Sequence, residues 1–131
     1  MSNGEQAPVG RIGWMDLTVP DATALRDFYT DVVGWKVESH PMGDYEDYSM
    51  KEPESDKVVA GVCHARGANA KIPPQWMLYI TVADLDASLQ KTRARGGKPI
   101  GEVRDMGPYG RMCVIEDPAG AVVALIQPPR P

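Results

Sequence analysis

The chain of 131 residues contains an internal repeat, and this repeat limits its possible folds more than any other feature. A shift of 63 residues takes Trp14 to Met77 and aligns two similar segments, WMDLTVPD and MLYITVAD. The same shift superposes five identical pairs: Thr18 with Thr81, Val19 with Val82, Asp21 with Asp84, Ala24 with Ala87 and Gly34 with Gly97. Self-similarity at a fixed period indicates one structural unit that occurs twice. We therefore expect two copies of one small module.

Each copy predicts a strand followed by a helix. The strand is the apolar run, rich in β-formers, that leads up to Asp21 or Asp84. These aspartates suit the position before a helix, because a short carboxylate accepts hydrogen bonds from the free N–H groups of the first turn. Each predicted helix then reaches a glycine, Gly34 or Gly97, that suits the left-handed position closing a helix.

Three further strands are predicted after each helix. They cover about residues 35–39, 45–51 and 57–65 in the first copy, and about 99–103, 110–116 and 121–127 in the second. Residues 66–74 end in two prolines and predict a linker between module one, about 10–65, and module two, about 75–128. Because a module of about 60 residues buries little surface alone, we expect a single α+β domain over 1–131. In it, two βαβββ modules in tandem form a curved mixed sheet around a cavity.

Composition limits the partners and the location of the protein. The chain has 14 Lys and Arg against 18 Asp and Glu, a net charge of -4, so it lacks the basic excess that nucleic acid requires. No apolar run approaches the roughly 20 residues that cross a bilayer. The first ten residues do not resemble a secretory signal, so we expect a cytoplasmic protein without membrane contact. Cys63 and Cys113 suggest no disulfide framework and are expected to be reduced and packed.

Several motifs occur in a characteristic order along the chain. They are residues 14–21, Phe28-Tyr29, Gly34-Trp35, Thr81-Val82-Ala83-Asp84, Gly96-Gly97, Gly110-Arg111-Met112 and Asp117-Pro118-Ala119-Gly120-Ala121. On these residues, over about 10–128, the chain resembles the vicinal oxygen chelate superfamily, which includes glyoxalase I, bleomycin-resistance proteins and extradiol dioxygenases. It is most similar to a glyoxalase-like or hydroxylase-like branch. The resemblance implies paired βαβββ modules around a metal ion held by His or Glu, and a homodimer.

The residues at the metal-ligand positions depart from that pattern. Carried over from the family, these positions fall on Trp14, Gly61, Met77 and Ala124. Side chains of these types offer none of the imidazole, thiolate or carboxylate donors that a transition metal needs. We therefore expect neither metal nor cofactor. The two histidines, His40 and His64, could form a different metal site, but strand alternation places His64 on the face opposite Gly61.

The resemblance also places a ligand pocket between the modules. Strand alternation from Trp14 brings Asp16 to the same face, and the repeat pairs Asp16 with Tyr79. By resemblance, Arg111 and Cys113 turn inward, and the repeat pairs them with Tyr48 and Met50. The expected ligand-binding residues are therefore Trp14, Asp16, Tyr48, Met50, Met77, Tyr79, Arg111 and Cys113. An apolar concavity with a few polar groups is typical of small-molecule sites.

The sequence leaves three functions open. The first is a metal-free module that binds a small, partly aromatic or amphipathic molecule by stacking. The second is a lyase, isomerase or hydroxylase-like enzyme in which Asp16 is the general base, Tyr79 its hydrogen-bond partner and Arg111 an oxyanion stabiliser. The third is an interaction domain without a ligand. Two structural alternatives also stand: Trp14 and Met77 fill the cavity as core, or Asp16 and Arg111 form an internal ion pair.

Overall fold

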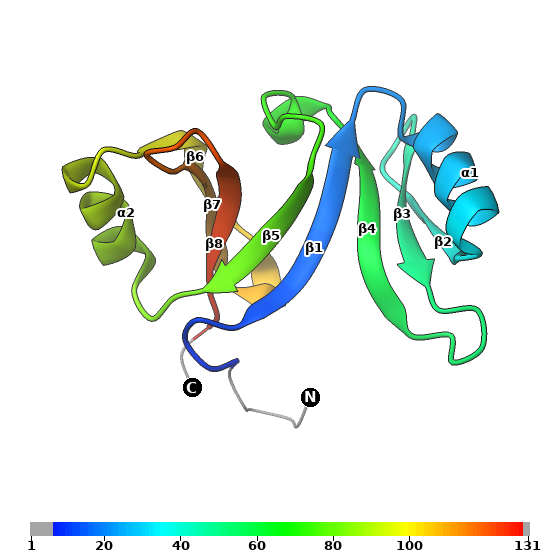
Figure 1. Ribbon diagram of the computed structural model, residues 1–131, viewed down its shortest axis with the longest axis horizontal. Helices are drawn as coiled ribbons and strands as arrows, with labels where there is room; N and C mark the ends of the chain where they lie inside the picture. Colours follow the sequence, from blue (N-terminus) through cyan, green and yellow to red (C-terminus); the bar gives the residue numbers. More distant parts are fainter. Residues whose placement is uncertain (1–6, 130–131) are drawn as a thin grey trace. The chain divides into compact units, whose positions relative to one another are not determined.

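The computed structural model describes residues 7–129. The prediction that the first ten residues are not a secretory signal therefore falls partly on residues outside the described part of the chain. The elements follow the order predicted from the repeat, a strand, a helix and three strands, twice over (Figure 1). The predicted α+β architecture of two βαβββ modules is therefore confirmed. The chain divides into two compact units, Trp14–Trp76 and a second unit of Met77 onward with the residues leading up to Gly13. Neither helix in the described part of the chain is long and apolar enough to span a membrane.

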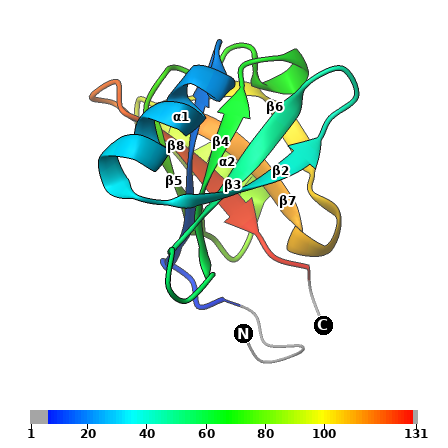
Figure 2. The same ribbon diagram turned by 90° about the vertical axis from the view of Figure 1, so that its right-hand side faces the viewer.

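The first unit is a four-stranded mixed sheet with one helix on it. Its elements are β1 (Ile12–Val19), α1 (Ala22–Val33), β2 (Lys36–Pro41), β3 (Glu46–Lys51), β4 (Val58–His64) and a 3₁₀ turn (Gly67–Asn69). The strands hydrogen-bond in the order β2-β3-β4-β1. β1 and β4 run parallel, while the other neighbours run antiparallel. Figure 2 turns the molecule so that α1 and the β2 edge face the viewer.

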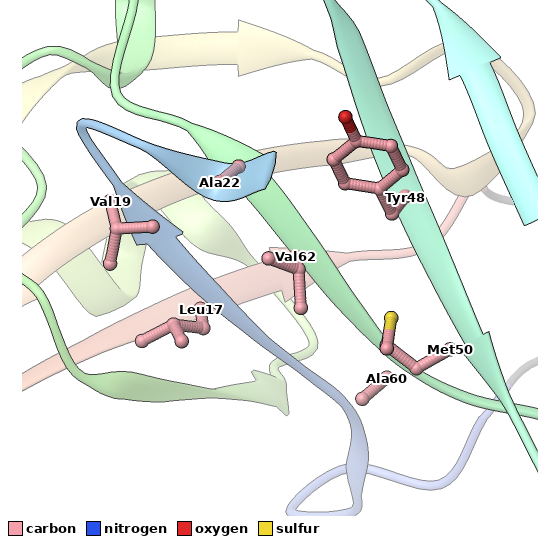
Figure 3. Packing of buried hydrophobic residues seen from close by; sticks show 7 residues of the cluster. All are labelled: Leu17, Val19, Ala22, Tyr48, Met50, Ala60 and Val62. Carbon is pink, nitrogen blue, oxygen red and sulfur yellow. The ribbon is translucent and has the colours of Figure 1, made fainter. Parts of the chain in front are cut away.

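Local sequence signals determine both ends of α1. The Asp21 Oδ1 atom accepts a hydrogen bond from the Ala24 N–H at 3.1 Å. At the other end Gly34 has the predicted left-handed backbone, with φ of +88°, and its N–H donates to the Thr30 carbonyl. Between these caps, buried side chains from the helix and three strands form the core shown in Figure 3: Leu17, Val19, Ala22, Tyr48, Met50, Ala60 and Val62.

The second unit repeats this arrangement. Its elements are β5 (Trp76–Thr81), α2 (Leu85–Ala94), β6 (Lys98–Asp105), a 3₁₀ turn (Gly107–Tyr109), β7 (Arg111–Glu116) and β8 (Val122–Gln127). The strand order is β5-β8-β7-β6, with β5 and β8 parallel. Asp84 caps α2 as predicted, because its Oδ1 atom accepts from the Ala87 N–H at 3.1 Å. The face of the sheet toward α2 is closed by Leu85 and Leu89.

The end of α2 differs from the prediction. The helix ends at Ala94, and Gly96, not Gly97, has the left-handed backbone, with φ of +93°. Gly97 meets a different constraint, since a Cβ atom there would lie 2.6 Å from the Glu116 carbonyl oxygen. A side chain would therefore push β7 away. The second glycine of the pair serves close packing of two chain segments, while the first serves the turn.

Candidate functional site

The sheet of the first unit has one face that does not contact α1, here called the distal face. Leu17 and Val19 of β1 belong to the core under α1. Because side chains alternate along a strand, Trp14, Asp16 and Thr18 point to the distal face. The Trp14 Nε1–H donates to the Asp16 Oδ2 atom at 3.3 Å. Asp16 is 8% exposed, and Trp14 is half-buried. β1 thus presents an indole fixed beside a buried carboxylate.

Gly61 on the neighbouring strand leaves room for the Trp14 ring. Gly61 of β4 is the register partner of Asp16. A Cβ atom at Gly61 would lie 3.2 Å from Trp14 Cζ2 and 3.2 Å from Asp16 Cβ, which is tighter than ordinary contact. The six-membered part of the indole therefore lies against bare backbone. We call Trp14, Asp16 and Gly61 the indole platform.

Polar side chains continue across the distal face beyond Gly61. Ser49 of β3 is the register partner of Gly61, and Glu38 of β2 is the partner of Ser49. The His40 Nε2 atom lies 2.7 Å from the Ser49 Oγ atom, a hydrogen bond whose direction depends on the His40 tautomer. Lys51 Nζ lies 2.9 Å from Glu38 Oε1, and the hydrogen bond from Lys51 holds the pKa of Glu38 below its usual value.

A protonated thiol lies within the same face. Cys63 is half-buried on β4, two residues after Gly61 and therefore on the distal side. Burial, together with the Asp16 and Asp47 carboxylates, raises the pKa of this thiol to about 12. A thiol with this pKa stays neutral at physiological pH and is a poor nucleophile. Cys63 thus contributes a small, neutral contact surface, as its predicted reduced and packed state implies.

Two residues expected in the pocket, Tyr48 and Met50, lie on the opposite face. Met50 is completely buried in the core under α1. The Tyr48 hydroxyl lies 2.8 Å from Thr23 Oγ1 on α1, and the Arg26 guanidinium lies 5.0 Å from the centre of its ring. The prediction that Tyr48 and Met50 share a face with Gly61 is therefore wrong. The register places Ser49, not its neighbours, beside Gly61.

The second unit requires the same correction. Arg111 donates from both terminal guanidinium nitrogens to Asp86 on α2, at 3.4 and 3.2 Å. Cys113 is buried against Leu85 and Leu89 of α2, and burial raises the pKa of its thiol. Both residues therefore lie on the α2 side of their sheet, whereas the inward orientation was expected. Val114, not Cys113, is the register partner of Ala124.

Met77 and Tyr79 do lie on the face away from α2. Tyr79 is the register partner of Ala124 on β8. Buried apolar side chains make up most of this face: Met77, Met112, Val114, Val122 and Ala124. Met77 is only 1% exposed, which agrees with the alternative in which its side chain fills the core. The two units thus differ, because the polar groups gather on the distal face of the first.

The two histidines have separate environments. His64 lies on the α1 side, as predicted, with its ring near that of Tyr48. Its Nδ1 atom is 2.8 Å from the Glu46 carbonyl oxygen, and its backbone N–H donates to Asp47 Oδ1. His40 lies near the end of β2 on the distal face, whereas the sequence analysis raised it only as a possible metal ligand. The register of β2 and β3, which brings His40 to Ser49, could not be derived from strand alternation alone.

The donor set does not fit the metal that the resemblance implies. The side of Gly61 that would carry a ligand side chain faces Trp14 instead, and an indole ring supplies no metal donor. Over residues 7–129, no three His, Cys, Asp or Glu side chains are grouped so that they could hold one ion. The side chains at these positions therefore do not fit a metal ion.

Comparison with known proteins agrees with this architecture. Residues 11–125 match the model of the Glyoxalase/Bleomycin resistance protein/Dioxygenase superfamily. The chain belongs to this superfamily. A protein of Mycobacterium tuberculosis (strain CDC 1551 / Oshkosh) whose name refers to a glyoxylase, CFP32, is 38% identical over 119 residues. The anthracycline biosynthesis protein DnrV of Streptomyces peucetius is 33% identical over 131 aligned positions.

These curated relatives are longer than the chain. The alignments cover 90% and 88% of the chain but 46% of each relative, so the chain spans about half of their length. Among solved structures, methylmalonyl-CoA epimerase from Mycobacterium tuberculosis has a TM-score of 0.53 at 20% identity, covering 96% of this chain and 94% of the epimerase. A superfamily member from Vibrio splendidus 12B01 has a TM-score of 0.57 at 16% identity, covering 87% and 96%. These structures share the fold.

Proposed function

We propose that this chain is a metal-free member of the superfamily that binds a small, planar organic molecule on the distal face of the first unit. The observation that carries the proposal is the indole platform. Trp14 is fixed by a hydrogen bond to Asp16 and by contact with Gly61, at the positions where relatives are expected to hold a metal. A rigid aromatic side chain gives large contact area to a ligand with little loss of conformational entropy.

The name of one relative agrees with a planar ligand. DnrV is named for the biosynthesis of anthracyclines, which contain fused planar rings. The distal face offers such rings an apolar contact at Trp14 and a small neutral group at Cys63. Of the eight residues expected in the ligand site, this proposal keeps Trp14 and Asp16 as its centre. The four residues that face α1 or α2 have no direct role in it.

Titration of the protein with anthraquinone, followed by tryptophan fluorescence and calorimetry, tests the proposal. We expect Trp14→Ala to weaken binding by at least about tenfold, because the stacking surface is lost. Trp14→Phe should retain most of the affinity. Met15→Ala is the matched control, since Met15 is the next residue on β1 and points to the other face. Binding that is unchanged in Trp14→Ala, or that requires one equivalent of a divalent metal, would contradict the proposal.

A catalytic function of the same face is the second candidate. It is favoured by Asp16, a carboxylate that is 8% exposed and lies beside the indole, in reach of a ligand stacked there. In this hypothesis Asp16 is the general base of an isomerase, lyase or hydroxylase-like reaction. Arg111 cannot be assigned the oxyanion role, because its guanidinium is engaged with Asp86. Asp16→Asn distinguishes the two candidates: an enzyme loses turnover while binding persists, whereas a binder changes only modestly in affinity.

The expectation of a cytoplasmic homodimer stays a prediction. Light scattering at micromolar concentration tests the oligomeric state, and a strictly monomeric species would contradict it.

A further inference from the structure

One hydrogen-bonded pair on the distal face is not used by the indole platform. His40 and Ser49 are joined at 2.7 Å on neighbouring strands β2 and β3. The His40 side chain is 46% exposed, and Ser49 is half-buried, so a ligand can reach both. Ser49 is the register partner of Gly61, one strand away from the backbone that supports Trp14.

The spacing of the strands relates this pair to the platform. Neighbouring strands are about 4.8 Å apart, so β2 lies roughly 10 Å across the sheet from β4, and His40 is two residues along β2 from Glu38, the residue level with Gly61. Gly61 has no side chain that could separate Trp14 from Ser49. A ligand of two or three fused rings that contacts the indole can therefore extend over β4 and β3 and place its far end at the pair.

The surrounding charges select the type of ligand group. The Glu38 carboxylate lies 3.9 Å from His40 Nε2, and Lys51 is paired with the same carboxylate. Glu38 and Lys51 form an ion pair with no net charge, so a charged ligand group at His40 would gain no net electrostatic attraction. The serine hydroxyl both donates and accepts, and the imidazole does the same in either tautomer. A neutral oxygen satisfies these groups best.

We infer that the His40–Ser49 pair recognises a neutral hydroxyl or carbonyl oxygen on a planar ligand that is held against Trp14. This inference rests on the proposed function and adds to it the polar group that the ligand carries and where that group lies. The pair acts in specificity, since it discriminates between ligands that have the oxygen and ligands that lack it.

The test compares an anthraquinone that carries a hydroxyl group on a terminal ring with unsubstituted anthraquinone, whose two carbonyl oxygens lie on the central ring and not at its far end; both are titrated into the full chain. We expect the hydroxylated probe to bind about fivefold more tightly, which is the size of one net hydrogen bond. In Ser49→Ala and in His40→Gln this preference should fall to about one, while the affinity for unsubstituted anthraquinone stays the same. Ser39→Ala is the matched control, because Ser39 is exposed on β2 next to His40 but belongs to the opposite face.

The possible outcomes separate this inference from the proposed function. If both probes bind through Trp14 but the preference is absent in the wild type, or persists in Ser49→Ala and His40→Gln, the inference is wrong and the platform stands. If neither probe binds up to its solubility limit, the proposed ligand class is wrong and the inference is overturned with it. Circular dichroism and the thermal midpoint of each variant check that the fold is retained. His40→Gln is the second variant in case Ser49→Ala perturbs its strand, because glutamine keeps a polar side chain of similar length.

Discussion

Substituting alanine for Gly110 should destabilise this protein far more than the same change at other glycines with positive φ. Gly110 directly precedes β7 and has φ of +103° and ψ of −144°, a region that is essentially restricted to glycine. A Cβ atom there would lie 1.9 Å from the Gln127 carbonyl oxygen and 2.9 Å from the Pro128 Cα atom. The end of β8 would therefore have to move away from β7.

Two costs add up at this position. The strained backbone costs about 1–3 kcal/mol, and forcing an extra carbon into a packed contact typically costs a further ~1–3 kcal/mol. Gln127 also accepts a hydrogen bond through its Oε1 atom from the Leu85 N–H at 2.7 Å, so a displaced Gln127 weakens the start of α2. We expect a loss of about 2–6 kcal/mol in the free energy of unfolding, a large part of the ~5–15 kcal/mol typical of a domain.

Urea unfolding of Gly110→Ala and of a matched variant, Gly120→Ala, measures the steric part separately. Gly120 has φ of +92° but open space around the position of its missing Cβ, so its substitution carries only the backbone cost. With a slope m of about 1–3 kcal/mol/M, the Gly110 variant should unfold at a midpoint roughly 1–3 M lower than the wild type, and well below Gly120→Ala. Equal midpoints for the two variants at unchanged m would refute the reasoning, since the contact with Gln127 would then cost nothing.

The remaining predictions concern titration and a surface ion pair. Burial, with Asp16 and Asp47, raises the pKa of the Cys63 thiol from 9.0 to about 12, so the folded chain holds this proton more tightly than the unfolded chain does. The resulting stabilisation is complete below pH 9 and is lost as the pH rises toward 12. The thermal midpoint should therefore fall more steeply above pH 9 in the wild type than in Cys63→Ala. Parallel curves of thermal midpoint against pH for the two proteins would contradict the raised pKa of Cys63. Arg111→Ala should lower the free energy of unfolding by no more than about 1 kcal/mol, and by less at high salt, because the side chains of Arg111 and Asp86 are 42% and 68% exposed. A double-mutant cycle of Arg111 and Asp86, measured by urea unfolding, checks this value. A coupling energy well above it would contradict the prediction.

The elements of this fold could be predicted because the signals that define them are local. Asp21 and Asp84 accept from the first turns of their helices, and Gly34 closes the first helix, as a reader of the sequence expects. These interactions span three or four residues, so they form in nearly the same way wherever the segment occurs. The second helix shows the limit of such signals. Of two adjacent glycines, the choice of Gly96 for the turn depends on how closely Gly97 packs against β7.

The candidate site was predicted only in part. Trp14 and Asp16 lie together beside Gly61, in agreement with strand alternation from the first strand. Ser49 and Glu38, which extend the distal face, were missed. Tyr48 and Met50 were expected in their place, and alternation within β3 would have excluded them if the register of β3 against Gly61 had been known.

The sequence by itself determined that one module occurs twice, where each helix and strand lies, and which residue types stand at the metal-ligand positions. Tertiary structure alone decided which face each inner strand presents. Side chains alternate with a period of two, so an error of one residue in the register moves a whole strand's side chains to the other face. The registers that decided the site place Ser49 beside Gly61 and Val114 beside Ala124, and they arise from pairing between strands, which leaves no local mark in the sequence.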